Sequence, residues 1–357
     1  MRFTIKRAVG TLLAAAMLTS LFACGSTQDT QSSSSAADKG SAASEEASTN
    51  KTTSGGTLSI AYVGSGVNFP NDLLGIAIDQ GYLDEELGEI GWTYESNSFA
   101  GGNLVNESLI SGEAQIGVLG DVPAMSSKIK GANTTLLAGE VYANDAALVV
   151  APDSDIKTIQ DLKGKVVATL EGSFMHKVLM NMLDDNGMSM DDIQFTNMQS
   201  ADAAAAVETG AVDAALLSEV QYSVAATNNE IKVILSGSDK NEWRGSTSIV
   251  VDSDFLAENR AVAVAFMTAY AKAYDYAINN YDAAITCLAQ SGMSEEALKF
   301  RFPDTVEYNL RADDQLVTAM EGVQKFLQDA QISDAQVDLD TWIDSSVLEE
   351  AQDSLKS

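Results

Sequence analysis

Residues 205–219 read A-A-V-E-T-G-A-V-D-A-A-L-L-S-E, the pattern of a helix end followed by a buried strand. Gly210 is typical of a helix C-terminus, because glycine adopts the left-handed conformation there at little cost. The apolar run Val212–Leu217 predicts a short strand covered by helices on both faces of its sheet. Ser218 and Glu219 then lie at the carboxyl end of this strand, which is where open α/β sheets bind ligands.

The same pattern occurs earlier in the chain. Residues 108–121 read S-L-I-S-G-E-A-Q-I-G-V-L-G-D, again a helix end, a glycine, an apolar strand and a polar exit. The matching pairs are Gly112 with Gly210, Gln115 with Asp213, Leu119 with Leu217, and Asp121 with Glu219. The match predicts that Asp121 and Glu219 lie at equivalent strand ends.

The repeat extends upstream of both stretches. Gly56–Ser65 is similar to Gly164–Ser173, since each predicts a strand that runs into Gly-Ser and then into a helix. A second strand follows in each copy, near Trp92–Tyr94 and near Ile193–Thr196. Helix–glycine–strand units are common, so chance agreement is the alternative. Four elements in the same order favour a βαβαβ unit that occurs twice.

The first 23 residues have the features of a secretory signal. Three basic residues precede the apolar run Val9–Ala23, which is shorter than the roughly 20 residues that a spanning helix needs. Leu21–Gly25, L-F-A-C-G, resembles the bacterial lipobox, and this implies cleavage before Cys24 and lipidation of that residue. An ordinary signal peptide with an accidental cysteine is the alternative. We expect the mature protein to be anchored to the membrane and not to span it.

The counts of cysteine and histidine bound the chemistry. The chain has two cysteines and one histidine, so neither a disulfide scaffold nor a zinc or iron site of the usual kind is expected, and no cofactor is implied. The helical context of Cys287 predicts a small buried side chain. Residues 25–54 are rich in Ser, Ala and Thr and predict a flexible tether.

Length and charge narrow the class further. The chain has 357 residues and a formal net charge of -30. The roughly 300 residues after the tether are enough for two domains with cores of their own. We expect no nucleic-acid partner, because nucleic acids require basic patches.

The loop Gly64–Pro70 is the first candidate ligand loop. It contains glycines, Ser65 and Asn68, and it leads into a helix predicted from about Asp72 to Gln80. Glycines, a hydroxyl and a helix N-terminus together favour an anion. The Gly-Lys-Ser/Thr of a P-loop and the third glycine of a dinucleotide fingerprint are both missing. An ordinary strand-to-helix turn is the alternative.

Leu136–Glu140 and Ala146–Val150 predict two further strands, which we assign to a first lobe. Ala151–Asp155 is polar and contains Pro152, so we expect the chain to cross there into a second lobe and to return near Gly245–Ser246. The expected divisions are a signal peptide (1–23), a lipidated cysteine with its tether (24–55), a first lobe (56–151 and 247–357) and a second lobe (152–246).

Two loops of the second lobe carry candidate ligand residues. Ser173 ends a Gly-Ser turn that opens a helix, and His176 lies in the first turn of that helix. His176 is either a ligand residue or an ordinary packing residue. Trp243 and Arg244 would supply an apolar wall and a fixed cation, as a sulfonate or carboxylate requires. A Trp that covers the hinge beside a solvated Arg is the alternative.

From Asp254 onward the pattern is helical. An aromatic stripe on one helix face predicts core rather than a cofactor site. The stripe consists of Phe266, Tyr270, Ala273, Tyr274, Ala277 and Tyr281. Further helices are expected at about Ser294–Phe300, Asp313–Gln328 and Leu339–Leu355, where they would cover the first lobe and the hinge.

Together these features resemble the solute-binding lipoproteins of bacterial ABC importers, in the branch that binds aliphatic sulfonates, taurine and nitrate and is related to the pyrimidine-precursor binders. The motifs that carry the resemblance are D-L-K-G-K at Asp161–Lys165, G-S-F-M-H at Gly172–His176 and G-A-V-D-A at Gly210–Ala214. Two departures leave the ligand open. Gln115 replaces the more usual Asp, and Ser218-Glu219 stands where many relatives have Glu-Pro or Trp-Pro.

The resemblance implies an α/β, two-lobed periplasmic-binding-protein fold of type II, with two βαβ lobes joined by a two-strand hinge and a helical C-terminal part. It implies a monomer on the outer face of the cell membrane that closes on a small molecule and delivers it to an ABC permease and ATPase. Ligand contacts are expected from Ser65, Asn68, Asp121 and Asn144 of the first lobe, and from Ser173, His176, Glu219, Trp243 and Arg244 of the second.

Asp121 and Glu219 bear on the charge of the ligand. In this arrangement the two carboxylates face each other across the cleft, and desolvating both without a cation is costly. We therefore expect a ligand with a positive group, such as taurine, with its ammonium on the acids and its sulfonate on Arg244. A thiamine precursor with a basic ring also fits, and nitrate stays open. Helix capping is the alternative role for either acid.

Two other classes of function stay open. Pyrimidine synthases share the implied fold, but the Cys-rich motif of those relatives is absent, and His176 has no evident nucleophile as its partner. We therefore expect no catalysis. A ligand sensor that signals to a receptor instead of a permease is the other class.

Overall fold

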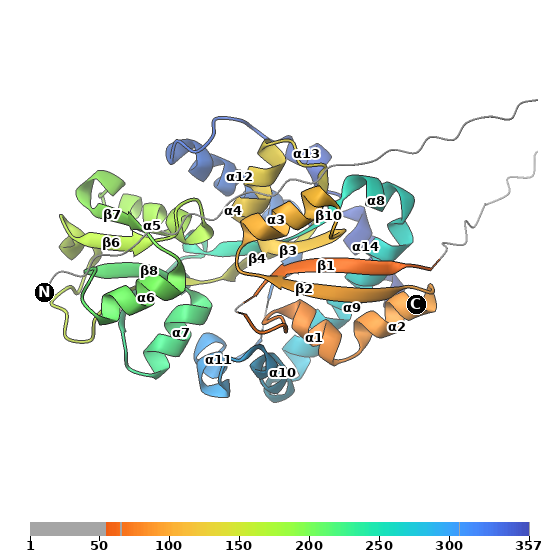
Figure 1. Ribbon diagram of the computed structural model, residues 1–357, viewed down its shortest axis with the longest axis horizontal. Helices are drawn as coiled ribbons and strands as arrows, with labels where there is room; N and C mark the ends of the chain where they lie inside the picture. The colour runs from red at the N-terminus through yellow and green to blue at the C-terminus, as the bar shows by residue number, and fades with distance from the viewer. Residues whose placement is uncertain (1–54, 65, 307, 357) are drawn as a thin grey trace, which may run out of the picture. The chain divides into compact units, whose positions relative to one another are not determined.

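The computed structural model describes residues 55–64, 66–306 and 308–356, which form two β-sheets with helices on both faces (Figure 1). The predicted signal peptide, Cys24 and Ser65 lie outside these residues. One sheet has six strands in the order β11-β4-β10-β3-β1-β2. These strands are β1 (Thr57–Val63), β2 (Thr93–Phe99), β3 (Ile116–Gly120), β4 (Thr134–Asn144), β10 (Gly245–Asp252) and β11 (Leu310–Arg311).

The second sheet has five strands in the order β7-β6-β8-β5-β9. They are β5 (Ala146–Val150), β6 (Val166–Thr169), β7 (Gln194–Asn197), β8 (Ala214–Ser218) and β9 (Lys232–Ser236). Helix α5 (Phe174–Asp185) covers one face of this sheet, and α6 (Ser200–Glu208) and α7 (Glu219–Thr227) cover the other.

Two groups of helices enclose the six-stranded sheet (Figure 1). One face packs against α1 (Leu73–Asp79), α2 (Tyr82–Glu89), α8 (Ser253–Glu258), α9 (Arg260–Asn279), α10 (Tyr281–Leu288), α11 (Glu295–Arg301) and α14 (Ser346–Ser354). The other packs against α3 (Gly102–Ser111), α4 (Asp121–Ile129), α12 (Asp314–Asp329) and α13 (Leu339–Trp342).

The predicted repeat is present in the sheet topology. The parallel strands β2-β1-β3 of one sheet correspond to β7-β6-β8 of the other, and in each sheet the next neighbour is an antiparallel strand. Gly112 and Gly210 end the helices α3 and α6 with φ angles of 77° and 73°, the left-handed conformation for which glycine was expected. The two copies therefore place Asp121 and Glu219 at equivalent strand ends.

Gln115 and Asp213 perform the same task in the two copies with different groups. The Gln115 side chain accepts a hydrogen bond from the Ser59 N–H at 2.8 Å. The Asp213 carboxylate accepts one from the Val166 N–H at 2.8 Å. Each side chain thus bonds the neighbouring strand just before its own strand begins, so the Gln that departs from the usual motif keeps the structural role.

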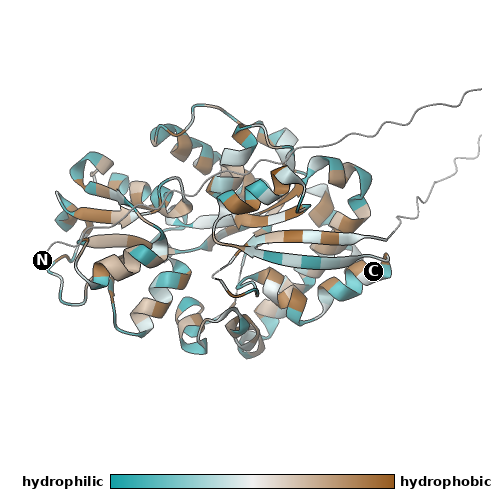
Figure 2. Ribbon diagram, in the orientation of Figure 1, coloured by the Kyte–Doolittle hydropathy of each residue, from teal (hydrophilic) through white to brown (hydrophobic). Residues whose placement is uncertain are grey.

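The core follows the alternation of strand side chains. In β1, Leu58, Ile60 and Tyr62 enter the core on one face, and Ala61 enters the core on the other. Figure 2 shows β3 and β6 largely in hydrophobic colours, whereas the outer strand β2 is mostly hydrophilic. The predicted aromatic stripe is core at Phe266 and Tyr270, which are fully buried, whereas Tyr274 and Tyr281 are partly buried and pack against that core.

The strand Ala146–Val150 differs from our expectation, because it belongs to the five-stranded sheet. It pairs antiparallel with both β8 and β9. Pro152, the expected crossing point, follows a strand that already lies in the second sheet. The chain instead crosses at Asp145, between β4 and β5.

The long helix expected at Leu339–Leu355 is interrupted. Ile343 forms a bridge with Leu136 of β4, and the Asp344 N–H donates to the Leu136 carbonyl at 3.0 Å. The sheet thus takes the backbone groups that a continuous helix would have used, and the helix divides into α13 and α14.

Candidate ligand-binding site

The two acids of the repeat begin helices directly after a strand. Asp121 is the first residue of α4 after β3, and Glu219 is the first residue of α7 after β8. Both residues are buried, with exposed fractions of 0% and 7%. Buried carboxylates require partners, so the partners of these two acids matter for any role in ligand binding.

Asp121 is paired with a cation from the other sheet's helices. Its Oδ2 lies 2.9 Å from Nζ of Lys177 in α5 and accepts the Ser246 N–H at 3.0 Å. Its Oδ1 accepts the Val122 N–H at 2.8 Å. Lys177 is itself 5% exposed, so this is a fully desolvated ion pair with additional hydrogen bonds.

Glu219, which follows a strand of the five-stranded sheet, is paired with a cation from a helix on the six-stranded sheet. Its Oε2 lies 2.9 Å from Nε of Arg301, which ends α11 on the six-stranded sheet. The contact is an ion pair without the alignment of a hydrogen bond. Burial raises the pKa of Glu219, and the Arg301 and Arg244 guanidinium groups partly offset that effect. The Asp145 N–H lies 3.5 Å away from the same oxygen.

These pairs correct the premise for a positively charged ligand. We expected two carboxylates that share a cleft without a cation. Each acid is instead neutralised by a cation of the protein, Asp121 by Lys177 and Glu219 by Arg301. The acids therefore require no ammonium group from a ligand. Neither the Lys177 nor the Arg301 partner was among the residues expected from the sequence.

The side chains of Asn68 and Asn144 form hydrogen bonds with strand residues of the six-stranded sheet. The Asn68 Oδ1 accepts the Tyr62 hydroxyl at 3.2 Å. Asn144 ends β4 and exchanges hydrogen bonds with the Thr247 hydroxyl at 3.1 and 3.3 Å. Asn144 thus ties together the two strands on which the chain leaves and re-enters the six-stranded sheet.

Ser173 and His176 organise the start of α5. The Ser173 hydroxyl accepts the His176 N–H at 3.3 Å as the N-cap and donates to the Leu170 carbonyl at 2.6 Å. The His176 ring stacks on Phe195, with centroids 5.2 Å apart, and meets Phe326 edge-on at 5.4 Å. Burial lowers the pKa of His176. These contacts support the packing role for His176.

Trp243 also packs. It is 8% exposed, lies in the core formed with α5, and donates from Nε1 to the Asp185 carboxylate at 2.6 Å. Its neighbour Arg244 behaves differently. The Arg244 Nε is buried without a hydrogen-bond partner, and no carboxylate of the described residues forms an ion pair with the guanidinium.

Arg244 lines a cavity of about 420 Å³. The cavity lies where the chain segment that leads out of the five-stranded sheet meets the six-stranded sheet and its helices. Arg244 and Asn241 come from the segment before β10, and the other lining residues come from β4 and from the chain near β11 and α12. The full lining is Val141, Tyr142, Ala143, Asn241, Arg244, Asn309, Gln315 and Thr318. One guanidinium, three amides and two hydroxyls, with no carboxylate, suit an anion with several acceptor oxygens.

Two lining residues have an uncommon backbone conformation. Tyr142 and Asn309 have φ angles of 54° and 48°. The Tyr142 N–H donates to the Ser246 hydroxyl at 3.1 Å, and Asn309 bonds the Val141 carbonyl through Nδ2 at 2.8 Å. Left-handed non-glycine residues persist where the surroundings fix them, and they cluster at ligand sites.

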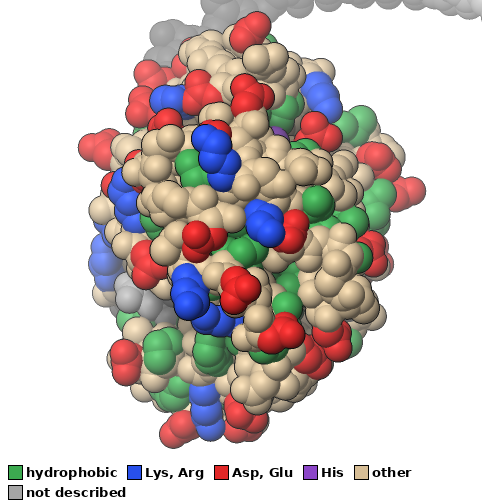
Figure 3. Space-filling view, turned by 90° about the vertical axis from the view of Figure 1, so that its left-hand side faces the viewer, with side chains coloured by type: hydrophobic (Ala, Val, Ile, Leu, Met, Phe, Trp, Pro, Cys, Tyr) green, Lys and Arg blue, Asp and Glu red, His purple; other side chains and the backbone are tan. Residues whose placement is uncertain are grey.

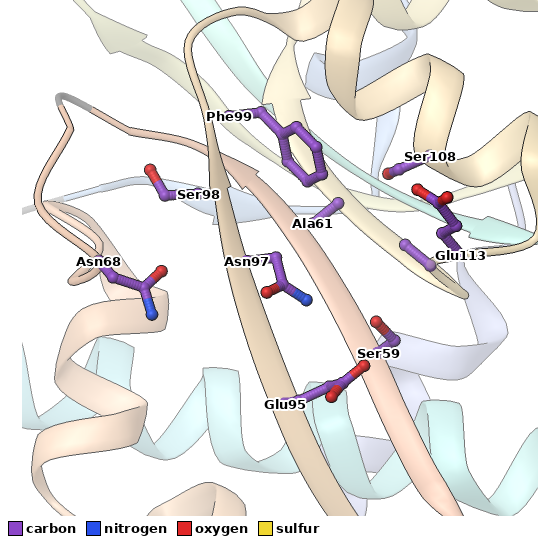
Figure 4. A pocket seen from close by; sticks show the side chains of 10 residues that line it. Ser59, Ala61, Asn68, Glu95, Asn97, Ser98, Phe99, Ser108 and Glu113 are labelled. Atoms are coloured by element: carbon purple, nitrogen blue, oxygen red, sulfur yellow. The ribbon is translucent and has the colours of Figure 1, made fainter.

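A second cavity, of about 600 Å³, follows the outer strand β2 (Figure 4). Figure 4 shows Ser59 of β1 beside Glu95 and Asn97 of β2, whereas Ser98 points the other way, towards Asn68. This cavity contains two carboxylates and no cation, and all of its lining comes from the first sheet's unit. It lacks the charge that an anion needs.

Three further buried acids, which the sequence did not reveal, do not line the Arg244 cavity. Burial raises the pKa of Asp72 to about 6, and it raises the pKa of Glu140 well above the usual range. No well-formed hydrogen bond reaches the carboxylate of Glu140, and the Thr247 hydroxyl and Leu73 N–H only partly offset its burial. Asp145 is satisfied by the hydroxyls of Tyr222 and Ser236, both at 2.6 Å.

Other features of the described part bear on its chemistry. Cys287 is buried, as predicted, and burial raises the pKa of its thiol to about 12. Across residues 55–64, 66–306 and 308–356, no group of His, Cys, Asp and Glu is arranged to hold a metal ion. Over the same residues, no helix has the length and apolar character for crossing a membrane. Figure 3 shows acidic and basic side chains interspersed on the face it presents.

Comparison with known proteins identifies the family. The model of the NMT1/THI5-like family matches residues 76–284, more than half of the chain, so this chain belongs to that family. It is 35% identical over 145 residues to an Escherichia coli K12 protein named as an aliphatic sulfonates-binding protein. That alignment covers 40% of this chain and 46% of the relative, so the chain spans about half the length of that protein.

Solved structures establish the fold. The periplasmic sulfonate-binding protein SsuA of Methylobacillus flagellatus superposes with a TM-score of 0.74 at 22% identity, covering 84% of this chain and 94% of that chain. The desulfurization enzyme DSZB superposes with a TM-score of 0.66 at 17% identity, covering 84% and 99%. The expected periplasmic-binding-protein fold is thus confirmed, and it is a fold that both binding proteins and an enzyme adopt.

Proposed function

We propose that this protein is an extracytoplasmic solute-binding protein that captures a small organic sulfonate and delivers it to an ABC permease. The observation that carries the proposal is the unpaired Arg244 guanidinium in a cavity lined by residues of both sheets' units. A fixed cation without a carboxylate partner can give its full charge to an anionic ligand. The sulfonate-binding names of the relatives agree with this chemistry.

The geometry favours a plain alkanesulfonate over a zwitterion. A sulfonate has three acceptor oxygens, and Arg244, the amides of Asn241, Asn309 and Gln315, and the Thr318 hydroxyl are donors for them. The acids that would have bound an ammonium are already paired with Lys177 and Arg301. Nitrate would use the same cation, but its three atoms of oxygen around one nitrogen fill far less of the cavity.

Binding and closure would be coupled through the two chain crossings. Asn241 and Arg244 precede β10, whereas Tyr142 and Asn309 belong to the other side of the cavity. A ligand that contacts both sides stabilises the arrangement in which they approach each other. The permease would then distinguish the loaded protein by that arrangement.

The side chains best suited to catalysis are placed for packing. His176 lies between the rings of Phe195 and Phe326, and Cys287 is buried with its pKa raised to about 12. A general base must reach the proton it takes, and a thiol must ionise to attack. Binding therefore fits this site better than the chemistry of the desulfurization enzyme that shares the fold.

Titration calorimetry of the purified protein tests the proposal. Ethanesulfonate should bind stoichiometrically and without turnover, and nitrate and an aminopyrimidine should bind more weakly. Arg244→Gln should weaken ethanesulfonate binding by about 2 kcal/mol, as expected for the loss of a charged hydrogen-bonding partner. Arg260→Gln, which alters an ion-paired surface arginine, is the matched control and should bind normally. Equal affinity in Arg244→Gln and wild type would place the ligand elsewhere.

We also propose a lipid anchor at Cys24, which lies outside the described residues. Cys24→Ser should release the protein into the medium or leave the precursor uncleaved. Membrane fractionation followed by mass spectrometry measures where the variant is and whether it is cleaved. A variant that stays membrane-bound at normal mass would refute the lipid anchor.

A further inference from the structure

We infer that Arg301 is a specificity-determining residue that makes the ligand site reject solutes with an ammonium group. The inference rests on the proposed sulfonate-binding function and names which sulfonates are bound. Arg301 forms the ion pair with Glu219, the acid that follows β8. It thereby occupies the position at which a ligand ammonium would meet a carboxylate.

Of the two acids, Glu219 has the position that best matches a ligand-binding residue. It lies at the strand end where this class of sheet binds ligands. The Glu219 Oε2 lies 3.5 Å from the backbone nitrogen of Asp145, and the preceding Asn144 pairs with Gly245, which directly follows the cavity-lining Arg244. A zwitterion with its sulfonate on Arg244 would therefore bring its ammonium towards Glu219.

Besides Glu219, two aromatic rings and one backbone carbonyl hold Arg301 in this place. Its guanidinium lies 4.5 Å from the ring centroid of Phe302 and 5.6 Å from that of Tyr308. Its Nη1 donates to the Asn71 carbonyl at 3.2 Å. The side chains of Arg301 and Glu219 are only 5% and 8% exposed, so the pair closes the carboxylate to any second cation.

The other acid of the repeat is neutralised by the protein as well. Lys177 neutralises Asp121 in the other copy, at 2.9 Å and with 6% exposure. A zwitterion entering the site would have to desolvate its ammonium without finding a free carboxylate. A plain sulfonate carries no ammonium group, so the two ion pairs do not weaken its binding.

The test compares taurine with ethanesulfonate, which differs by lacking the amine. Titrations of wild type and all variants are run at the same pH. Wild type should prefer ethanesulfonate, and Arg301→Met should shift the affinity ratio towards taurine by about tenfold or more, equivalent to 1.4 kcal/mol. Arg260→Met is the control arginine and should leave the ratio unchanged. An unchanged ratio in Arg301→Met, or loss of both ligands, would overturn the inference.

A second variant guards against misfolding of the first. Glu219→Leu combined with Arg301→Met removes both charges, a change that buried ion pairs often tolerate. Its affinity ratio should show no gain for taurine over ethanesulfonate. A gain for taurine in this double variant would refute the role of Glu219. If wild type binds no sulfonate, the proposed function itself fails; if it binds taurine as tightly as ethanesulfonate, only this inference fails.

Discussion

Nζ of Lys177 lies 2.9 Å from Oδ2 of Asp121, although α5 packs on the five-stranded sheet and α4 packs on the six-stranded one. Both side chains are almost completely removed from water. Such a pair gains from mutual attraction only while both members stay in place, and either one left alone is a buried uncompensated charge. The pair therefore holds the two units together at this point.

Lys177→Met should lower the free energy of unfolding by about 3–5 kcal/mol, because it leaves the Asp121 carboxylate buried without its cation. Urea unfolding monitored by circular dichroism measures the change. Lys165→Met is the matched control, since the Lys165–Asp213 pair is 45% and 37% exposed and should contribute less than about 1 kcal/mol. Equal effects of the two substitutions would show that Lys177 is not desolvated in solution.

Trp243→Phe separates packing from binding. The substitution keeps an aromatic ring in the core but removes the hydrogen bond from Nε1 to Asp185. We expect a loss of about 1 kcal/mol in stability, the typical value for one hydrogen bond, and an unchanged affinity for ethanesulfonate. Urea unfolding and calorimetry measure the two quantities. A large loss of affinity with normal stability would return Trp243 to the ligand site.

His176 should make the protein sensitive to acid. Burial lowers the pKa of the folded imidazole below its ordinary value of 6.5, and Glu171 only partly opposes this. Below pH 6.5 the unfolded chain then binds a proton that the folded chain does not, so stability falls as the pH drops. His176→Phe should lose less stability between pH 7 and pH 5 than wild type does. Parallel pH profiles for the two proteins would contradict this.

Glu140 should act in the opposite direction. Burial and the nearby Asp72 raise its folded pKa, and Arg301 offsets them only in part. The folded chain keeps a proton that the unfolded chain releases above its ordinary pKa of 4.5, so stability falls as the pH rises from there. Glu140→Gln should therefore be more stable than wild type at pH 8, by about 1 kcal/mol or more, and nearly equal at pH 4.5. Unfolding titrations at both pH values check this. A constant difference would point to packing instead.

The repeat was predictable because it depends on local rules. The helices that end at Gly112 and Gly210 each require a residue in the left-handed conformation. The short apolar run after each glycine is typical of a strand in a sheet that helices cover on both faces. These rules also located Asp121 and Glu219 at strand ends. Sequence reasoning therefore placed both acids correctly in the fold.

The partners of those acids were not predictable in the same way. Lys177 is 56 residues from Asp121 in the chain, and Arg301 comes from a helix outside the repeat. Periodicity tells which face of α11 is buried, but not which carboxylate the last residue of α11 meets. The error at Ala146–Val150 has a similar origin, since a buried strand reads alike in either sheet. A cation on an otherwise apolar helix face, such as Lys177 in α5, is the one signal that was available.

The pairing of Asn144 with Gly245 brings the two chain crossings together at one place. The segment from Ala146 to Arg244 thus begins and ends at neighbouring points, and its own five-stranded sheet lies entirely within it. Segments whose ends meet can be moved between hosts as cassettes. Exchanging this cassette between members of the family would transfer Lys177, Glu219 and Arg244 together, while Asp121 and Arg301 stay with the host. Chimeras that fold and bind would then reveal which charge pairs have changed together during divergence.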